Sequence, residues 1–141
     1  MIALRHAPNA VAPAFRELSK LVGGDWTGHI DANTVIHQRF EFAVEGKVIR
    51  GTGAVTVQGK TVLFLHSNLG WDPVAKQVSY VDFHNHDTIF LGHITMDGSS
   101  LKYDFKEFAD PKKHYEAKCS FVDANHYRFT VGTEVLTMER S

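Results

Sequence analysis

The chain has 141 residues, of which 43% are hydrophobic and 22% are charged, and its formal net charge is -1 at pH 7. This length is enough for one domain with a single core, and the composition is typical of a globular protein. Lys and Arg together number 15 against 16 Asp and Glu, and no run of basic residues is longer than two. The sequence therefore lacks the basic stripe of a nucleic-acid-binding surface, and we expect no nucleic-acid partner.

Residues 1–12 are expected to form a flexible arm, because a short chain end with Pro8 and Pro13 has little to hold it. They also lack the unbroken apolar core of a signal peptide. No stretch approaches the ~18 apolar residues of a membrane span, so we expect no membrane partner. The single cysteine, Cys119, cannot form an internal disulfide, which is typical of a reducing compartment. These features predict a cytoplasmic protein.

A short helix is expected to begin at Pro13. Phe15, Leu18 and Val22 recur at three- and four-residue spacing, which is the period of an amphipathic helix. Proline is favoured in the first turn of a helix, and Gly23-Gly24 is a typical helix end. The pattern predicts a helix of roughly two to three turns, long enough to cover one end of a barrel.

After Trp26 the hydrophobic pattern changes to a period of two, which is typical of strands with one buried and one exposed face. Phe40 and Phe42, for example, alternate with Arg39 and Glu41. Turn-forming residues separate the alternating segments at hairpin spacing. The expected strands are one that starts at Trp26, then residues 36–44, 48–58, 61–69, 77–84, 88–96, 101–106, 115–121, 127–131 and 134–140.

These segments predict an all-β fold, an antiparallel barrel of about nine or ten strands with one short N-terminal helix. No crossover helix separates the strands, which excludes parallel βαβ folds. Gly51 and Gly53 lie inside one of the expected strands, where they indicate a bend or a bulge.

The segment 24–28, Gly-Asp-Trp-Thr-Gly, resembles the Gly-X-Trp signature that opens the first strand of calycin barrels, the superfamily of lipocalins and fatty-acid-binding proteins. Segments 69–73 and 79–82, with Gly92 and the Asp97-Gly98 hairpin, are similar to a bacterial family of single-domain lipocalin-like proteins. The resemblance implies one lipocalin-like β-barrel domain over residues 13–141. It also implies that Arg140 stacks on Trp26, a cation–π contact worth about 0.5–2 kcal/mol.

Haem is not expected as a cofactor. The haem-binding relatives called nitrobindins have a longer glycine-alternating signature after the tryptophan, and here His29, Asp31 and Ala32 replace it. The sequence predicts no other cofactor.

The aromatic residues are the main candidate for a binding site. Ten Phe, four Tyr and two Trp are many for this length. A barrel of this size can enclose a small molecule, although the same rings can also fill a solid core. The first hypothesis is a pocket for a small, largely apolar molecule. Its expected walls are Phe40, Phe42, Phe64, Tyr80, Phe90, Tyr103, Phe105 and Tyr115, with His66, Asp82 and His84 as polar contacts.

Asp82 and His84 also support a second hypothesis, an enzyme that acts inside the same pocket. Residues two apart in a strand face the same side, so the two groups could act as an acid–base pair near Tyr80. His84 and His86, joined by His66, are an alternative as metal ligands, although structural zinc usually has four ligands.

The third hypothesis is a solid barrel that acts as an interaction module. A homodimer could form through an exposed strand edge or through the Trp71-Asp72-Pro73 turn, where the Trp71 ring would be the anchor. The alternative is that this ring folds back on the barrel. Cys119 alternates with apolar residues and is expected to be a buried hydrophobic residue without chemistry.

Overall fold

The computed structural model describes residues 13–141, which fold into a closed antiparallel barrel of ten strands with one short helix. This confirms the predicted all-β fold, and the flexible arm expected at residues 1–12 lies outside the described residues. Each strand pairs with the next one in the chain, and β1 pairs with β10 to close the barrel. The strands are β1 (Trp26–Asp31), β2 (Thr34–Val44), β3 (Val48–Val57), β4 (Lys60–Asp72), β5 (Gln77–His84), β6 (Ile89–Asp97), β7 (Ser100–Glu107), β8 (His114–Asp123), β9 (His126–Val131) and β10 (Glu134–Arg140).

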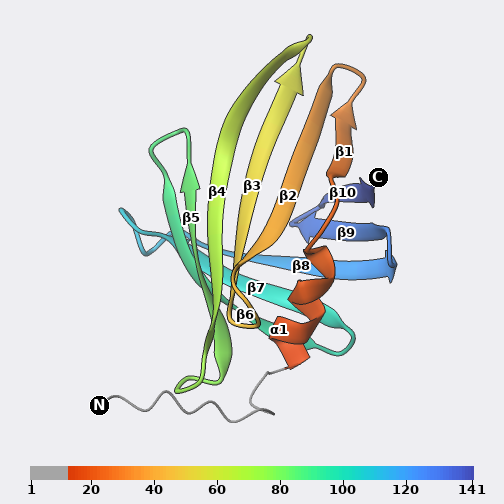
Figure 1. Ribbon diagram of the computed structural model, residues 1–141. Helices are drawn as coiled ribbons and strands as arrows, with labels where there is room; N and C mark the ends of the chain where they lie inside the picture. The colour runs from red at the N-terminus through yellow and green to blue at the C-terminus, as the bar shows by residue number, and fades with distance from the viewer. Residues whose placement is uncertain (1–12) are drawn as a thin grey trace.

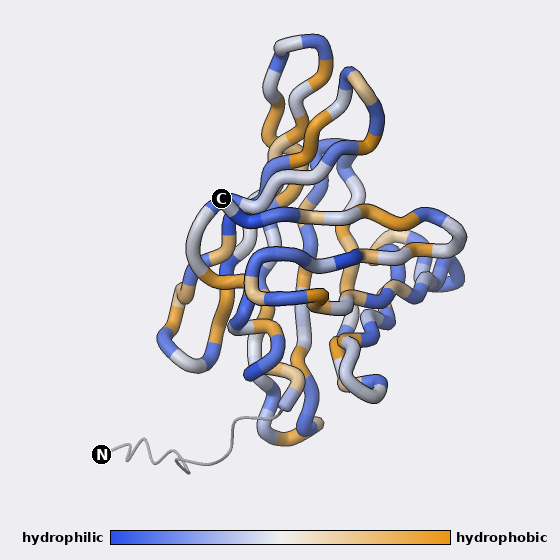
Figure 2. Tube along the Cα trace, turned by 90° about the vertical axis from the view of Figure 1, so that its right-hand side faces the viewer, coloured by the Kyte–Doolittle hydropathy of each residue, from blue (hydrophilic) through white to orange (hydrophobic). Residues whose placement is uncertain are grey.

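The barrel wall has two parts that run in different directions. The long strands β2, β3 and β4 rise through the view of Figure 1, whereas β7, β8 and β9 cross it on the other side of the barrel. Hydrophobic and hydrophilic residues alternate along the strands in Figure 2, as the period of two requires. The inward-facing members of this pattern form the core together with the helix.

The predicted helix is present as α1 (Pro13–Leu18), followed by a 3-10 turn, η1 (Ser19–Leu21). It covers the lower end of the barrel in Figure 1 and contacts β5, β6 and β7. Phe15, Leu18 and Leu21 are almost fully buried and join the core. No helix among residues 13–141 is long and apolar enough to cross a membrane.

The bend expected at Gly51 and Gly53 is a bulge between β3 and β4. Gly53 pairs with Leu65 and Ala54 pairs with Leu63, so Phe64 is an extra residue on β4. Both glycines face aromatic rings, because a Cβ on Gly51 would lie 2.8 Å from the Phe40 ring and one on Gly53 would lie 3.2 Å from the Phe64 ring. The two glycines therefore leave room for these two rings at the inner wall.

The strand β4 extends to Asp72, three residues beyond the expected end. Trp71 is therefore a strand residue and not part of the turn. Its ring is partly buried and packs against the core, as in the interpretation that the ring folds back on the barrel. An exposed tryptophan anchor for a dimer is thus not available at this position.

The barrel is closed by a contact between its two end strands. Trp26, at the start of β1, is completely buried, and its Nε1 donates a hydrogen bond to the Leu21 carbonyl at 2.8 Å. The guanidinium carbon of Arg140, at the end of β10, lies 4.5 Å from the centroid of the Trp26 ring. This is the contact that the resemblance to calycins implies.

The Arg140 guanidinium also binds three backbone carbonyls. It donates to Val22 at 3.1 Å and to Gly23 at 3.2 Å, and a further bond goes to Ala124. Gly24 has a φ of +71°, and a Cβ there would lie 2.9 Å from the Arg140 side chain. The helix end, the first strand and the β8–β9 turn thus meet on one side chain.

We expect Arg140→Lys to lower the free energy of unfolding by about 1–3 kcal/mol, because lysine keeps the charge but loses the planar fork that binds several carbonyls at once. Urea denaturation measures this difference. The control is Arg128→Lys, an exposed position on the neighbouring strand β9, which should change stability by less than about 0.5 kcal/mol. Equal effects of the two substitutions would contradict the role given to Arg140.

Candidate ligand-binding cavity

The interior of the barrel holds a cavity of about 360 Å³ that is partly open to solvent. Eight of the ten strands contribute to its wall, and Leu21 of η1 contributes at the helix end. Most of the lining is aliphatic or aromatic, with a few polar side chains from β2, β4 and β5. The lining residues are Leu21, Ile36, Gln38, Phe40, Phe64, Leu65, Ser67, Leu69, Tyr80, Asp82, His84, Phe90, Tyr103, Phe105, Cys119, Tyr127, Phe129 and Leu136.

A continuous series of rings runs along one side of this cavity. His84 and Phe90 have ring centroids 5.0 Å apart, and Phe90 lies 5.4 Å from Phe105, both edge to face. Phe105 lies 6.3 Å from Tyr80, which is 5.7 Å from Tyr103. Edge-to-face pairs such as these add about 0.5–1.5 kcal/mol beyond the area they bury. This side of the cavity is therefore built from rings that contact one another.

Asp82 is the acidic residue of the cavity wall. It lies on β5 opposite Ser67 of β4 and Phe90 of β6. Burial of the carboxylate raises the pKa of Asp82 to about 6, although a side-chain hydrogen bond with Ser67 acts in the opposite direction. An ionised group is therefore held at neutral pH in surroundings that favour its neutral form.

The other polar groups of the cavity are neutral at pH 7. Burial raises the pKa of Tyr80 and of Tyr103 above the ordinary value, and the Asp82 charge adds to both shifts. The pKa of His84 is lowered, first by burial and then by repulsion from His86. The Tyr127 hydroxyl, whose pKa is also raised by burial, donates a hydrogen bond to Oε1 of Gln38.

Cys119 also lines the cavity. It is 1% exposed, and burial raises the pKa of its thiol to about 12. A thiol at this pKa is a poor nucleophile at neutral pH, because the thiolate is the reactive form.

Of the eleven residues expected in the binding site, eight line the cavity, and three do not. The eight are Phe40, Phe64, Tyr80, Asp82, His84, Phe90, Tyr103 and Phe105. Their role in binding stays a prediction. The alternation in 77–84 placed Tyr80, Asp82 and His84 on one face, and that face is the inner one.

His66 is exposed, because the bulge at Phe64 reverses the alternation in β4. Phe64 and Leu65 both face the cavity, and Ser67 then continues the inner face. A strand without the bulge would have put Phe64 and His66 on the same side. The sequence signal for the bulge was the glycine pair on β3, but it did not show which residue of β4 is the extra one.

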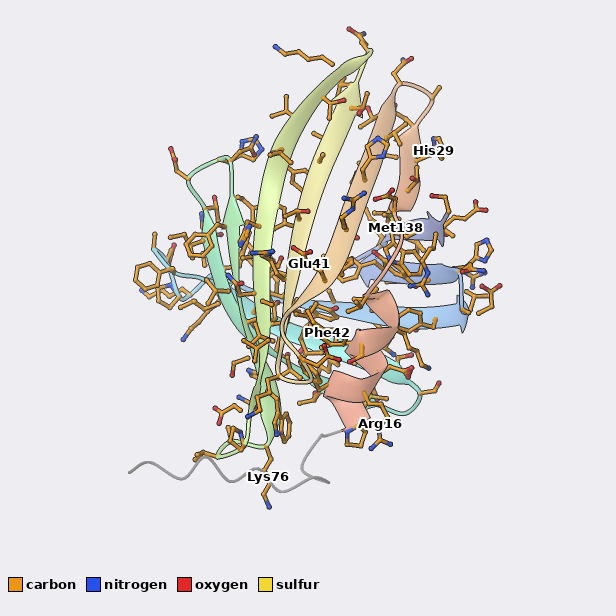
Figure 3. The ribbon with its side chains drawn as sticks, viewed as in Figure 1. Arg16, His29, Glu41, Phe42, Lys76 and Met138 are labelled. Atoms are coloured by element: carbon orange, nitrogen blue, oxygen red, sulfur yellow. The ribbon has the colours of Figure 1, made fainter. Side chains whose placement is uncertain are left out.

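Phe42 and Tyr115 are not among the residues that line the cavity. Phe42 packs against the core, on the part of β2 at the level of α1 (Figure 3). Tyr115 stacks on Phe105 at 5.4 Å, is 37% exposed, and donates a hydrogen bond to Glu107 at 2.7 Å. Sequence alternation gives the face of a residue but not its height in the barrel, so these two positions could not be separated from the lining residues.

The sequence-based prediction of the cavity wall left out several residues that line it. Gln38 lies between Ile36 and Phe40 on the same face of β2, and the alternation of that strand was the signal that could have found it. Ser67 was not predicted, because the bulge at Phe64 changes which residues of β4 face inward. The remaining omissions are apolar or aromatic residues of the same inner faces and Cys119: Leu21, Ile36, Leu65, Leu69, Tyr127, Phe129 and Leu136.

The histidines do not form a metal centre in the described part of the chain. No group of three or more His, Cys, Asp or Glu side chains able to hold a metal ion is found among residues 13–141. His66 faces outward, and His86 is an exposed turn residue after the end of β5. His66 and His84 therefore lie on opposite faces of the wall, and the structure does not bring the three histidines together.

The closed ten-strand barrel with one short helix fits a calycin-like fold. No protein-family model and no curated protein matches the chain. The cavity and its side chains are thus the basis for an argument about function.

The pKa shift of Asp82 predicts a specific pH dependence of stability. Its carboxyl releases a proton near pH 3.8 in the unfolded chain and near pH 6 in the folded one, so the folded state binds more protons between these values. Stability then falls as pH rises through this range. We expect Asp82→Asn to stabilise the protein by about 2 kcal/mol more at pH 7.5 than at pH 4.

Urea denaturation of both proteins at the two pH values measures this effect. Asp97→Asn, which removes an exposed carboxylate paired with Lys118 at 3.3 Å, is the control and should change stability by less than about 1 kcal/mol. A loss of stability in Asp82→Asn at pH 7.5 would show that the carboxylate is a structural group.

Proposed function

We propose that this protein binds a small, largely apolar molecule inside the barrel. The observation that carries this proposal is the cavity of about 360 Å³ with its aromatic wall and few polar groups. Sites for small molecules are typically concave, mostly apolar and provided with a small number of oriented polar side chains. A closed barrel also gives such a molecule a site that is formed before binding.

The rival interpretation, a solid barrel used for interactions, is disfavoured by the same cavity. Protein interiors are normally filled to the density of organic crystals, with few voids larger than a water molecule. Each unfilled volume lowers stability, by about 24 cal/mol per Å³ in measured core substitutions. A cavity of this size in a small domain is therefore better explained by a ligand than by imperfect packing.

The protein is proposed to belong to the lipocalin-like calycin barrels. The supporting features are the helix before β1, the buried Trp26 at the start of that strand, and Arg140 stacked on its ring. The unpaired and buried Cys119 supports a reducing compartment such as the cytoplasm. A homodimer is a separate proposal that light scattering can test, and it would need a surface other than a strand edge, because the described strands form a closed ring.

A second candidate is an enzyme in the same cavity. It is favoured by the Asp82 pKa of about 6, which is in the range of a general base, and by the Tyr80 hydroxyl on the same face of β5, which stays protonated and can donate a hydrogen bond. Such an enzyme would exchange a carbon-bound hydrogen of its ligand with deuterated solvent, and Asp82→Asn would abolish the exchange. Binding of a ligand without hydrogen exchange would contradict the enzyme and would leave ligand binding as the proposed function.

Binding can be tested with the neutral fluorescent probe N-phenylnaphthylamine, whose emission rises in apolar surroundings. We expect saturable binding and a higher melting temperature in its presence, because a ligand that binds the folded state stabilises it. Ile36→Trp places a larger ring into the cavity and should weaken binding by about tenfold or more.

The matched control is His37→Trp, which adds the same ring at the next residue of β2, where the side chain is exposed. It should bind the probe like the unmodified protein. Equal loss in both variants, or probe binding that Ile36→Trp leaves intact, would place the binding site outside the barrel and overturn the proposal.

A further inference from the structure

We propose, resting on the binding function above, that the ligand is an organic cation, an amine or ammonium group on an apolar body, whose charge pairs with Asp82. The cavity combines one carboxylate with a wall of aromatic faces. These are the two features by which proteins recognise organic cations.

The charge of the cavity has one sign. Among the described residues that line it, Asp82 is acidic and none is Lys or Arg. His84 does not supply a positive charge at neutral pH, because burial lowers its pKa. An anionic ligand, such as a fatty acid, would therefore bring a second negative charge beside Asp82 without a cation to balance it.

The aromatic wall favours a positive charge for a separate reason. The face of an aromatic ring carries partial negative charge, so a cation within about 6 Å of the ring centre is attracted, by up to about 2 kcal/mol or more when water is excluded. Tyr80 and Tyr103 lie 5.7 Å apart, and Phe105 lies beside Tyr80. Tyr80 is also two residues from Asp82 on the inner face of β5, so ring and carboxylate flank the same part of the cavity.

The placement of Asp82 indicates that its charge is used. Its partners across the sheet are Ser67 and Phe90, which offer one hydroxyl and a ring. A carboxylate held for structure normally accepts several hydrogen bonds. A cationic ligand would add charge-assisted hydrogen bonds to the one that Ser67 provides and would replace the water that the carboxylate loses on burial.

Three probes with the same carbon skeleton separate charge from size: phenylbutylamine, phenylbutanol and phenylbutyrate. At about pH 8 the amine is a cation, the alcohol is neutral and the acid is an anion, while Asp82 is ionised. Isothermal titration calorimetry on the whole chain should show the amine binding about tenfold or more tightly than the alcohol, and the acid binding most weakly.

In Asp82→Asn the preference of the amine over the alcohol should fall to about twofold or less, because the amide keeps the shape and removes the charge. Asp97→Asn removes one negative charge outside the cavity and should keep the full preference. The comparison of the three probes on the unmodified chain does not depend on the folding of either variant.

The outcomes distinguish this inference from the binding function on which it rests. An alcohol or acid that binds as tightly as the amine, or an amine preference that survives Asp82→Asn, overturns the cationic ligand and leaves an apolar pocket. Failure of all three probes, together with failure of the fluorescent probe, overturns the binding function itself. An amine preference lost only in Asp82→Asn supports both.

Discussion

The contact between Arg140 and Trp26 is the point on which the closure of the barrel depends. In a chain of consecutive hairpins, nine of the ten strand pairs connect neighbours in sequence, and only the pair of β1 and β10 is long-range. That pair has a short register of three residue pairs, Trp26 to Gly28 with Met138 to Arg140. The guanidinium stack and its bonds to the carbonyls of Val22, Gly23 and Ala124 add cross-links at the end of this register. The edges of the sheet are thereby removed, and the interior becomes a defined space.

Why the interior is hollow follows from the distribution of small residues. Gly51 and Gly53 on β3 face the inside, and the rings of Phe40 and Phe64 lie over them. A Cβ at Gly51 would lie 2.8 Å from the Phe40 ring, so this ring occupies the space that a side chain at position 51 would need. Ser67 and Cys119 are further small side chains at inner positions. Aromatic residues that could have filled the core therefore line a cavity instead, and this distinguishes a hollow barrel from a solid one.

The fold was predictable from the sequence because each strand is amphipathic and each hairpin is short, so local pattern and global topology agree. The face of β5 was also predictable, since Tyr80, Asp82 and His84 lie in a strand without a bulge. The outward orientation of His66 was not predictable, because the extra residue Phe64 in β4 is selected by pairing with β3 and not by local sequence. Height along the barrel, which separates Phe40 from Phe42, depends on strand tilt and on where α1 sits. Neither is encoded in a two-residue period.

Asp123 and Asp82 differ in what their carboxylates do for the fold. Asp123 is a structural carboxylate, and Asp82 is not. Asp123 caps its turn by accepting a hydrogen bond from the Asn125 amide at 2.8 Å and contacts the His126 ring, and these partners lower its pKa. Asp82 has the opposite shift, because burial outweighs the single hydroxyl of Ser67. Ionisation of Asp123 stabilises the fold, whereas ionisation of Asp82 destabilises it. A carboxylate that opposes folding and faces a cavity with aromatic walls supports the proposal of a bound partner whose chemistry is complementary to a negative charge.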